Sequence, residues 1–325
     1  MTSYRISIRG VIKPLDTKMV FDMKYDNEGK LVRKCRYVIR GFRQREGIDY
    51  DKVYAPTLNK MSIKILLQIS VIKGWKRKLA DVGGAFVEAE VERKLYATVT
   101  DVLGNVIPTR LLKALYGLKQ AALLWNEKLD NIMTAIGLTK LVSDPCIYIE
   151  RDVDHNIIMM VSVHVDDMLV ISKTDHIGNR FMAIFARCVT KLKHIRDFNK
   201  YLGIEINHNL SNANEIILHQ YGYLDELLLR YNTTRRKTHT PMQSNMVIDY
   251  NVPEVTALET PALIHTLQEL SGTCLFLAAC TRPDILSTVG MLSQYTTKPS
   301  RMHMHIFYFV LFLSTPILIS IYLIS

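Results

Sequence analysis

The adjacent carboxylates Asp166 and Asp167 constrain the fold and the chemistry of this chain more than any other feature. Apolar runs at 157–163 and 168–172 flank them, which predicts two strands joined by a tight turn just after His164. Like charges this close repel, and one carboxyl would be driven neutral unless a cation lies beside the pair. Aspartate is also common in solvated β-turns, so the pair taken alone favours an ordinary turn over a metal site.

A third carboxylate, Asp81, changes that balance. It lies near the end of a predicted strand that breaks into a turn at Gly83-Gly84. Three carboxylates on neighbouring strand ends can hold two divalent ions about 3.5–4 Å apart, and Mg²⁺ prefers a few carboxylates together with phosphate oxygens of a substrate. The paired glycines let the backbone approach a phosphate or sugar closely. Phe86 then either stacks under a sugar ring or is an ordinary core aromatic.

The charge balance indicates the kind of partner. The formal net charge is +10 and the pI is about 9.3, which favours a polyanionic partner, nucleic acid first and an anionic membrane second. A solvated basic surface is the alternative. The five cysteines are odd in number and include no C-x-x-C pair. This argues against a disulfide scaffold and a zinc site and agrees with a reducing compartment.

The order of the predicted elements indicates the α+β class. Two β-like runs surround 27–29 as a hairpin, and its second strand is basic. Hydrophobic spacing predicts helices at 61–72, 111–136, 177–191 and 265–279. Further strands are predicted at 146–150 and, as a second hairpin, at 201–207 and 215–218. Residues 233–262 are polar and contain prolines, as a linker would.

Six segments carry a resemblance to a known family. They are RYVIRGFRQREGIDYDKVYAPT, DVGGAFVEAEVERKLYATV, LLKALYGLKQAALLW, VSVHVDDMLVIS, YLGIEI and TRPDILSTVGMLSQY. Together they resemble the reverse transcriptases of copia-type LTR retrotransposons, and the resemblance runs from about Pro14 to about His305. It implies an α+β, right-hand polymerase fold of fingers, palm and thumb or connection, with an antiparallel palm sheet.

The resemblance also implies an activity and a metal site. The protein would be an RNA-directed DNA polymerase, a nucleotidyltransferase that adds deoxynucleotides to a primer 3′-hydroxyl and releases pyrophosphate. Asp81, Asp166 and Asp167 would be catalytic and would bind two Mg²⁺ ions, with Mn²⁺ as an alternative. The implied partners are an RNA or DNA template with its primer, deoxynucleoside triphosphates and other products of the same polyprotein.

The same resemblance implies residues that contact the nucleotide and the primer. Arg36 and Arg40 would bind the incoming triphosphate, whose oxygens match a guanidinium fork. Phe86 would be the steric gate that rejects a ribose 2′-hydroxyl, and Gln120 would line the nucleotide pocket. The primer terminus would contact a third set of residues, namely His164, Tyr201 and Gly203.

Three departures from the family pattern bear on this interpretation. His164 stands where the family usually has Tyr before Val-Asp-Asp, which reduces the contact area offered to a primer. Glu88-Ala89 replaces the usual Asn-Gly, and Ala122-Leu123 replaces a Pro-x-Arg pattern, so local packing is expected to differ. The family places further polyprotein domains upstream and an RNase H domain downstream, and none of these is expected here. We therefore expect a truncated and degenerate polyprotein fragment.

The segment 306–325, IFYFVLFLSTPILISIYLIS, is apolar and uncharged. Its length reaches the threshold for a membrane-spanning helix, and Lys298 and Arg301 precede it as they would a tail anchor. The favoured alternative is sequence from a shifted frame or from flanking DNA in a decayed copy. A buried terminal helix is the third alternative, and the lack of a polar face argues against it.

These observations predict a division of the chain into three parts. Residues 14–205 would form the fingers and palm, 206–305 the thumb or connection, and 306–325 a tail outside the family fold. The expected location is the cytoplasm, in virus-like particles, with the nucleus as an alternative and a membrane not favoured. Two rival functions remain open: an inactive remnant that at most binds nucleic acid, and a tail-anchored membrane protein of unrelated function.

Overall fold

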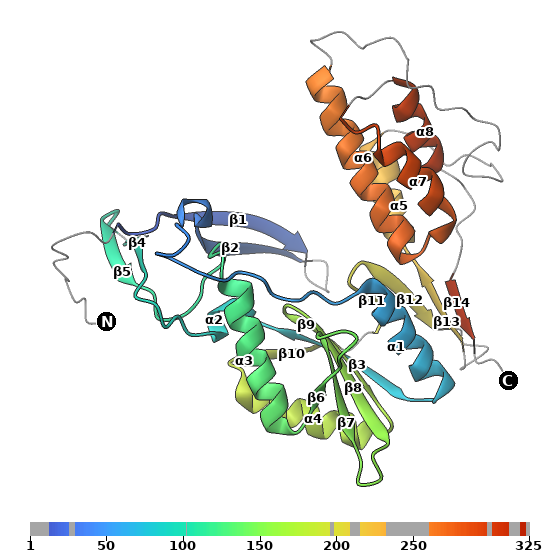
Figure 1. Cartoon of the computed structure of the whole chain (residues 1–325), viewed down its shortest axis with the longest axis horizontal. Coiled ribbons are helices and arrows are strands. Elements are labelled where there is room, and N and C mark those ends of the chain that lie inside the picture. Colours follow the sequence, from blue (N-terminus) through green and yellow to red (C-terminus); the bar gives the residue numbers. More distant parts are fainter. Residues whose placement is uncertain are drawn as a thin grey trace. The chain divides into compact units, whose positions relative to one another are not determined.

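The computed structural model describes residues 13–25, 30–101, 103–195, 198–208, 215–231, 260–297, 301–311 and 319–322 (Figure 1). The chain divides into two compact units, Met1–Leu58 with Lys76–Ile195 and Asn59–Trp75 with Arg196–Ser325. Helices and antiparallel sheets occur in both units, so the predicted α+β class is confirmed.

A six-stranded antiparallel sheet of order β10-β3-β9-β8-β7-β6 lies at the centre of the first unit. Its strands are β3 (Lys76–Val82), β6 (Thr139–Lys140), β7 (Ile147–Arg151), β8 (Ile157–His164), β9 (Asp167–Ser172) and β10 (Leu192–Ile195). Strand β3 pairs with β9, although more than eighty residues separate them in the chain. This pairing brings Asp81 to the β8–β9 turn.

Helices α2 (Ala85–Glu88), α3 (Ala121–Ile136) and α4 (Asp175–Cys188) complete this core. The Thr174 hydroxyl caps α4 by accepting a hydrogen bond from the Ile177 backbone N–H at 3.4 Å. α4 packs on β9, β3 and β8, and α3 packs on α4. Buried aromatic and aliphatic residues from the helices and the sheet form one continuous core, which includes Trp125, Phe181 and Phe185.

One predicted helix begins later than expected. The pattern at 111–136 predicts helix throughout, but α3 begins at Ala121. Gly117 has a φ of 89°, in the left-handed region, so the segment before α3 turns instead of continuing a helix. Leu112, in the part of this segment that is not helical, is exposed, whereas Trp125 and Leu129 of α3 are buried.

Two hairpins extend the first unit. They are β1 (Thr17–Tyr25) with β2 (Leu31–Ile39), and β4 (Tyr96–Thr100) with β5 (Val106–Arg110). The first confirms the hairpin predicted from the sequence, although its turn at 27–29 lies outside the described residues. The Leu15 backbone joins the two hairpins, donating to the Tyr96 carbonyl at 2.8 Å and accepting from the Thr98 N–H at 2.9 Å.

The second unit contains helices and a four-stranded sheet of order β11-β12-β13-β14. Its elements are α1 (Lys60–Ile72), β11 (Lys200–Tyr201), β12 (Ile204–His208), β13 (Glu215–His219), α5 (Tyr221–Arg230), α6 (Thr260–Cys280), α7 (Leu286–Ser293), α8 (Arg301–Leu311) and β14 (Ile319–Tyr322). Apart from their end residues, the helices predicted at 61–72, 177–191 and 265–279 are confirmed. The predicted linker lies outside the described residues up to 259.

The described part of the apolar segment after residue 305 belongs to this second unit. Ile306, Phe307 and Val310 of α8 are buried in one cluster with residues of α6 and α7, and β14 pairs with β13. Up to Leu311 the segment is therefore a packed helix, the alternative against which the sequence argued. Within the described ranges one helix, over Pro261–Cys280, is long and apolar enough to cross a membrane, a property that buried core helices share.

Candidate active site

The three predicted catalytic carboxylates meet at one end of the central sheet. Asp81 of β3 lies directly opposite Asp167, the first residue of β9. Asp167 in turn pairs with His164 across the β8–β9 turn. The Val82 backbone N–H donates to the Asp166 carbonyl at 2.8 Å, which ties the turn to β3. The register therefore brings together residues that the sequence separates by more than eighty positions.

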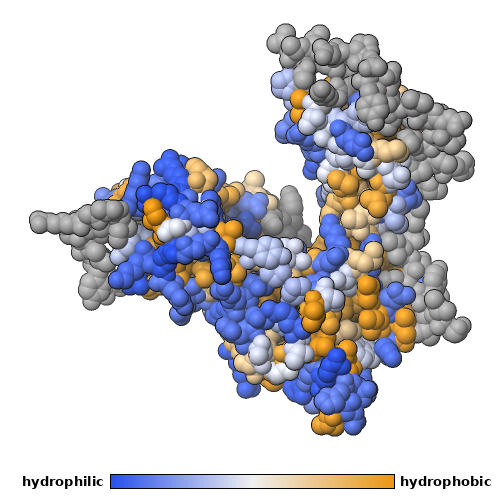
Figure 2. Space-filling view, viewed as in Figure 1, coloured by the Kyte–Doolittle hydropathy of each residue, from blue (hydrophilic) through white to orange (hydrophobic). Residues whose placement is uncertain are grey.

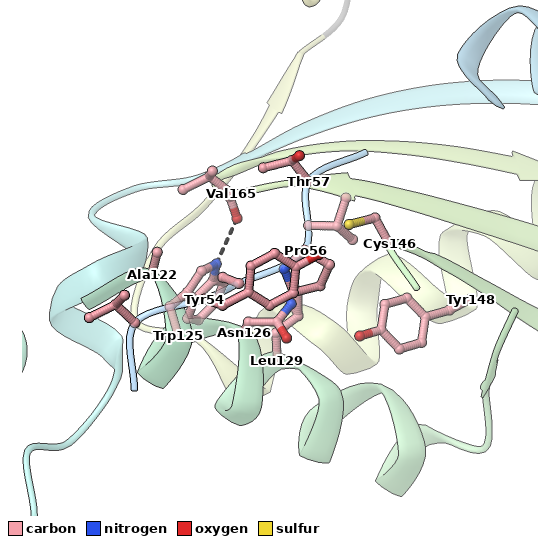
Figure 3. Close-up of a pocket in the computed structure, with 13 residues that line it drawn as sticks. Tyr54, Pro56, Thr57, Ala122, Trp125, Asn126, Leu129, Cys146, Tyr148 and Val165 are labelled. Atoms are coloured by element: carbon pink, nitrogen blue, oxygen red, sulfur yellow. Dashed lines mark hydrogen bonds between the residues drawn. The ribbon is translucent and has the colours of Figure 1, made fainter. Parts of the chain in front are cut away.

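The turn that carries Asp166 has an unusual backbone conformation. Val165 has a φ of 60°, in the left-handed region that β-branched residues rarely adopt. The Trp125 indole Nε1–H donates to the Val165 carbonyl at 2.6 Å (Figure 3). Because Trp125 is itself buried in the core, α3 acts as a fixed support for the turn.

A mainly apolar pocket lies beside this support (Figure 3). It has a volume of about 290 Å³. Its lining comes from α3, from β7 and the residue before it, from the end of β8 and the turn that follows, and from the segment before α1. The lining residues include Tyr54, Pro56, Trp125, Cys146, Tyr148 and Val165. Burial, together with the nearby Asp144, raises the pKa of the Cys146 thiol to about 11, so this cysteine is a neutral wall residue.

The carboxylates raise one another's proton affinity. Burial, and then the charges of Asp166 and Asp81, raise the pKa of Asp167 to about 6. Burial and the Asp166 charge also raise the pKa of Asp81, while Lys193, Lys34 and Lys191 oppose that shift. The site therefore concentrates negative charge beyond what its surroundings neutralise, as a cation-binding site does.

The donor chemistry fits Mg²⁺, although the side chains are not gathered as tightly as in a loaded metal site. Within the described ranges, no three His, Cys, Asp or Glu side chains lie close enough together to hold a metal ion as they stand. Three carboxylates at one sheet end are nevertheless the oxygen ligands that Mg²⁺ prefers. Burial and then the repulsion from Asp166 and Asp81 raise the pKa of Asp167, and a divalent cation would relieve that repulsion.

Arg36 reaches the site from the β1–β2 hairpin. Its guanidinium lies 6.0 Å from the centre of the Tyr116 ring, and one of its nitrogens is 3.5 Å from a carboxylate oxygen of Asp22. Arg40 follows β2, and its backbone N–H donates to the Asp16 carbonyl at 2.8 Å. Among the described residues, the Arg40 guanidinium makes no ion pair and no side-chain hydrogen bond. It is therefore available to a ligand.

The hairpin is joined to the segment before α3 by a close approach of two glycines. A side chain at Gly41 would place its Cβ 1.9 Å from the Gly117 carbonyl oxygen, and one at Gly117 would meet the Ile39 carbonyl oxygen at 2.1 Å. The Ile39 N–H donates to the Tyr116 carbonyl at 2.8 Å. Only glycine fits at either position, so the GFRQ and LYGLKQ motifs form one docked structure that sets where Arg36 lies.

Gln120 has an internal structural role. Its side-chain oxygen accepts from Gln44 Nε2 at 2.9 Å, and its Nε2 donates to the Asp49 carbonyl at 3.0 Å. Gln44 also accepts from the Lys119 backbone N–H at 2.8 Å. The Gln120 amide is thus used inside the protein to hold the GFRQ loop, and its contact with a nucleotide stays a prediction.

Tyr116 is a site residue that sequence reasoning missed. Its ring meets Phe86 of α2 edge-on, with 5.0 Å between centroids and an interplanar angle of 67°. Burial, and then the charges of Asp166 and Asp81, raise the pKa of its hydroxyl, against the opposing effect of Arg36. Tyr116 stands within the LYGLKQ motif, so its place in that motif was the signal available in the sequence.

Three lysines near Asp81 were also missed. Lys193 of β10 lies directly opposite Asp81, the Lys191 side chain packs against Gly83, and Lys34 lies on β2. All three are exposed, and each lowers the pKa of Asp81. The basic character of β2 was visible in the sequence, but the pairing of β10 with β3 was not.

The three predicted primer-contact residues are in different units. His164 lies at the end of β8, and its Nδ1 is buried without a hydrogen-bond partner among the described residues. Tyr201 and Gly203 lie in the second unit, at the tight β11–β12 hairpin where Leu202 and Gly203 both have positive φ. A Cβ at Gly203 would lie 2.7 Å from the Phe276 ring of α6.

Glu88, which stands where the family usually has Asn, has hydrogen-bond partners inside the protein. Glu88 is buried, its carboxylate accepts from the Thr190 N–H at 2.8 Å, and Lys128 donates to its backbone carbonyl at 2.7 Å. Burial alone would raise the pKa of Glu88, but the hydrogen bonds from Thr190 and the Lys128 charge hold it below its usual value. The substitution thus ties α2 to α3 and to the chain before β10.

Comparison with known proteins gives a consistent answer. The family model described as reverse transcriptase (RNA-dependent DNA polymerase) matches residues 5–244. The chain is 30% identical over 298 residues to the Retrovirus-related Pol polyprotein from transposon TNT 1-94 of Nicotiana tabacum, covering 90% of this chain and 22% of that protein. It is 29% identical over 304 residues to the polyprotein from transposon RE1 of Arabidopsis thaliana, covering 88% and 19%.

A more distant relative extends the comparison beyond plants. The truncated transposon Ty1-A Gag-Pol polyprotein of Saccharomyces cerevisiae is 23% identical over 297 residues, covering 88% of this chain and 24% of that protein. The chain spans about a fifth of the length of these curated relatives.

Proposed function

The chain belongs to the reverse transcriptase family of copia-type LTR retrotransposon Pol polyproteins, and from that premise we propose that it is an RNA-directed DNA polymerase. It would transfer a deoxynucleotide to a primer 3′-hydroxyl at the end of the central sheet. The observation that carries the proposal is the register of Asp81 opposite Asp167, with Asp166 in the adjoining turn.

The acidic end of the sheet suits two-metal nucleotidyl transfer. Asp81, Asp166 and Asp167 would hold two Mg²⁺ ions, which in such sites activate the attacking hydroxyl and stabilise the leaving oxygen. The protein contributes mainly position and charge, as phosphoryl-transfer enzymes do. The Trp125 indole and the Val82 N–H each donate to a carbonyl of the turn, so the backbone of the turn is fixed before substrate arrives.

The basic side chains suit a nucleoside triphosphate. Arg36 and Arg40 would bind its phosphate oxygens from the hairpin, and the exposed lysines around Asp81 would add positive charge beside the departing pyrophosphate. Guanidinium and ammonium groups pair strongly with phosphate. Phe86 would stand against the 2′ position of the sugar, where an extra hydroxyl of a ribonucleotide would collide with it.

The surface supports a nucleic-acid partner. Figure 2 shows hydrophilic side chains predominating over the region of β1, β2 and β4, and the chain carries a net charge of +10. Phosphate contacts by lysine and arginine supply most sequence-independent affinity for nucleic acid. In this proposal the central sheet is the palm, the β1–β2 hairpin belongs to the fingers, and the second unit supplies the thumb or connection.

A second candidate function has its own supporting observation. The carboxylates are not gathered tightly enough to hold a metal ion within the described part of the chain, and His164 replaces the usual aromatic residue before Val-Asp-Asp. Both features would suit a remnant that binds primer–template without extending it. Its distinguishing property is salt-sensitive binding of nucleic acid with no nucleotide incorporation.

Primer extension separates the two functions. The purified chain is mixed with an RNA template, a labelled DNA primer, Mg²⁺ and one deoxynucleotide at a time. The polymerase proposal predicts incorporation only of the nucleotide complementary to the next template base. Incorporation that ignores the template, or binding without incorporation, would contradict it.

A further inference from the structure

The apolar pocket beside Trp125 has no part in the function proposed above. It lies within the first unit, and its volume of about 290 Å³ is near the lower end of the range for pockets that hold small organic molecules. Trp125 and Tyr148 are almost completely buried, whereas Tyr54 is 79% exposed. The two buried rings therefore belong to the floor of the pocket, and Tyr54 stands at its mouth (Figure 3).

The residues that line this pocket carry no formal charge. The Cys146 thiol stays neutral, because burial and then the nearby Asp144 raise its pKa to about 11. A phosphate group that entered the pocket would lose its hydration without gaining a cation as a partner. The lining therefore selects against nucleotides and favours a neutral ligand.

The walls of the pocket suit a flat aromatic ring. The Trp125 indole N–H donates to the Val165 carbonyl at 2.6 Å, and the Tyr148 hydroxyl donates to the Asp130 carboxylate at 3.2 Å. Both side chains thus use their polar atom inside the protein and offer the pocket only ring surface. Stacked and edge-on ring pairs are favourable beyond simple burial, and the Cys146 sulfur adds a polarisable contact of the kind that aromatic rings favour.

A polar group in the lining is free to orient a ligand. Asn126 of α3 is half-buried, and its side-chain amide has no hydrogen-bond partner among the described residues. A partly buried amide gains from a hydrogen bond that a ligand supplies. A flat ring that carries one N–H group would satisfy the Asn126 oxygen and the apolar walls together.

The pocket also touches the support of the β8–β9 turn. Trp125 and Val165, the donor and the acceptor residue of the 2.6 Å hydrogen bond, both line it. Val165 has a φ of 60°, so its conformation depends on such contacts. A ligand that packs against the indole would therefore contact both partners of the bond that supports the turn carrying Asp166.

We propose that this pocket is a binding site for a small, neutral, flat aromatic molecule with one N–H donor, and that its occupation changes the Trp125–Val165 hydrogen bond. The ring packs against Trp125 and Tyr148, and the N–H donates to the Asn126 side-chain oxygen. None of the residues assigned above to metal, nucleotide or primer lines the pocket. The proposal therefore goes beyond the polymerase function and does not depend on it.

The polar contact is tested with two probes, each titrated into the full chain and followed by ¹⁹F NMR. They are 6-fluoroindole and 5-fluoro-1-benzothiophene, which has a similar ring shape without the N–H group. We expect 6-fluoroindole to bind with a Kd of about 0.1–5 mM, as its small size implies. Its advantage over the benzothiophene should fall about three- to tenfold in Asn126→Leu, as loss of one hydrogen bond implies. An unchanged advantage in Asn126→Leu would overturn the contact.

Asn131→Leu is the matched control for that comparison. Asn131 is an exposed residue of the same helix and does not line the pocket, so this variant should bind both probes as the original chain does. If Asn131→Leu reproduces the effect of Asn126→Leu, the change comes from the helix and the assignment of Asn126 fails.

The site itself is tested by filling it. Ala122 lines the pocket, so Ala122→Phe should abolish saturable binding of both probes, whereas Ala135→Phe, at an exposed position of the same helix, should leave binding unchanged. Thermal melting checks that each variant is folded, and if Ala122→Phe is not, the Asn126→Leu comparison decides. Saturable binding that a folded Ala122→Phe retains, or no saturable binding of 6-fluoroindole by the original chain, would overturn the site.

The link to the turn has a separate readout. In Trp75→Phe, the Trp125 Nε1–H gives the one tryptophan indole signal of the ¹⁵N-labelled chain. This signal should move as 6-fluoroindole is added, with the same saturation curve as the ¹⁹F titration. A signal that stays in place at saturation contradicts the link. None of these measurements needs primer extension, so their failure is distinguishable from failure of the polymerase proposal.

Discussion

The Trp125 indole nitrogen lies 2.6 Å from the Val165 carbonyl oxygen and joins α3 to the turn that carries Asp166, one of the proposed catalytic carboxylates. Val165 adopts a left-handed conformation there, which costs a non-glycine residue about 1–2 kcal/mol. The hydrogen bond is one of the contacts that offset this cost. It links the packing of the core directly to the geometry of Asp166.

Trp125→Phe should therefore lower both the activity and the stability of the protein. We expect the free energy of unfolding to fall by about 1–3 kcal/mol, from one buried hydrogen bond and some packing. The rate of nucleotide addition should fall at least tenfold at temperatures where the variant stays folded. Urea denaturation and single-nucleotide incorporation measure the two effects. Trp75→Phe is the control. It changes the other tryptophan of the chain, which lies in the second unit, and it should leave the rate unchanged.

Gly117→Ala tests the docking of the hairpin on the segment before α3. The new methyl group would lie 2.1 Å from the Ile39 carbonyl oxygen, and the residue has a φ of 89°. We expect a loss of at least about 2–3 kcal/mol in the free energy of unfolding, from backbone strain and overpacking together. Weaker binding of deoxynucleotide should accompany it, because Arg36 and Tyr116 are positioned by this contact.

Gly137→Ala is the matched control for that experiment. Gly137 has a φ of 98° but open space where a Cβ would stand. The free energy of unfolding of Gly137→Ala should fall only by the cost of the left-handed conformation, about 1–2 kcal/mol. Its nucleotide binding should be unchanged. If Gly117→Ala is no more destabilising than Gly137→Ala, the close approach is not a constraint on the fold.

Some features of the fold and of the candidate site could be predicted from the sequence, and others could not. The strands around Asp166–Asp167 and the basic hairpin follow from alternation and turn chemistry, and the structure has them. The pairing of β10 with β3, which brings Lys193 to Asp81, is set by tertiary packing and leaves no local signal. The late start of α3 depends on Gly117, whose role appears only when Ile39 lies against it. The assignment of Gln120 to the nucleotide came from its motif, which does not reveal that Gln44 and Asp49 already occupy its amide.

The raised pKa of Asp167 predicts how stability depends on pH. Its folded pKa of about 6 lies above the value near 3.9 expected in the unfolded chain. As pH rises, the unfolded chain therefore releases this proton at a lower pH than the folded chain does. The contribution of Asp167 to stability falls between about pH 4 and about pH 6, and it stays low above that range. Asp167→Asn should accordingly be more stable than the original chain at pH 7.5, on the order of 1 kcal/mol after allowing for solvent screening.

That difference should shrink towards pH 4 and should also respond to metal. Added Mg²⁺ should stabilise the original chain more than Asp167→Asn, because the cation relieves repulsion that the variant lacks. Thermal melting at pH 4.5, 6 and 7.5, with and without Mg²⁺, measures both effects. A constant difference across this range would contradict the pKa assignment.

Glu88 should behave in the opposite way. Its folded pKa lies below the usual range, since hydrogen bonds from Thr190 and the charge of Lys128 outweigh the effect of burial. The stabilisation it provides is present above about pH 4.5 and is lost as pH falls through the folded pKa. Glu88→Gln should cost about 1–3 kcal/mol at pH 7 and progressively less at lower pH. A loss that does not depend on pH would mean that Glu88 acts by packing alone.

We propose that Asp81, Asp166 and Asp167 form one metal-dependent polymerisation site. The most direct measurement is the rate of complementary nucleotide addition to a primer on an RNA template in Mg²⁺, for the original chain and for Asp166→Asn. Asp154→Asn, in the exposed turn between β7 and β8, is the control. We predict template-dependent addition by the original chain and the control, and a loss of at least a thousandfold in Asp166→Asn, since each ligand contributes to a shared charge-stabilising site. Addition by Asp166→Asn at the rate of the original chain would contradict the account.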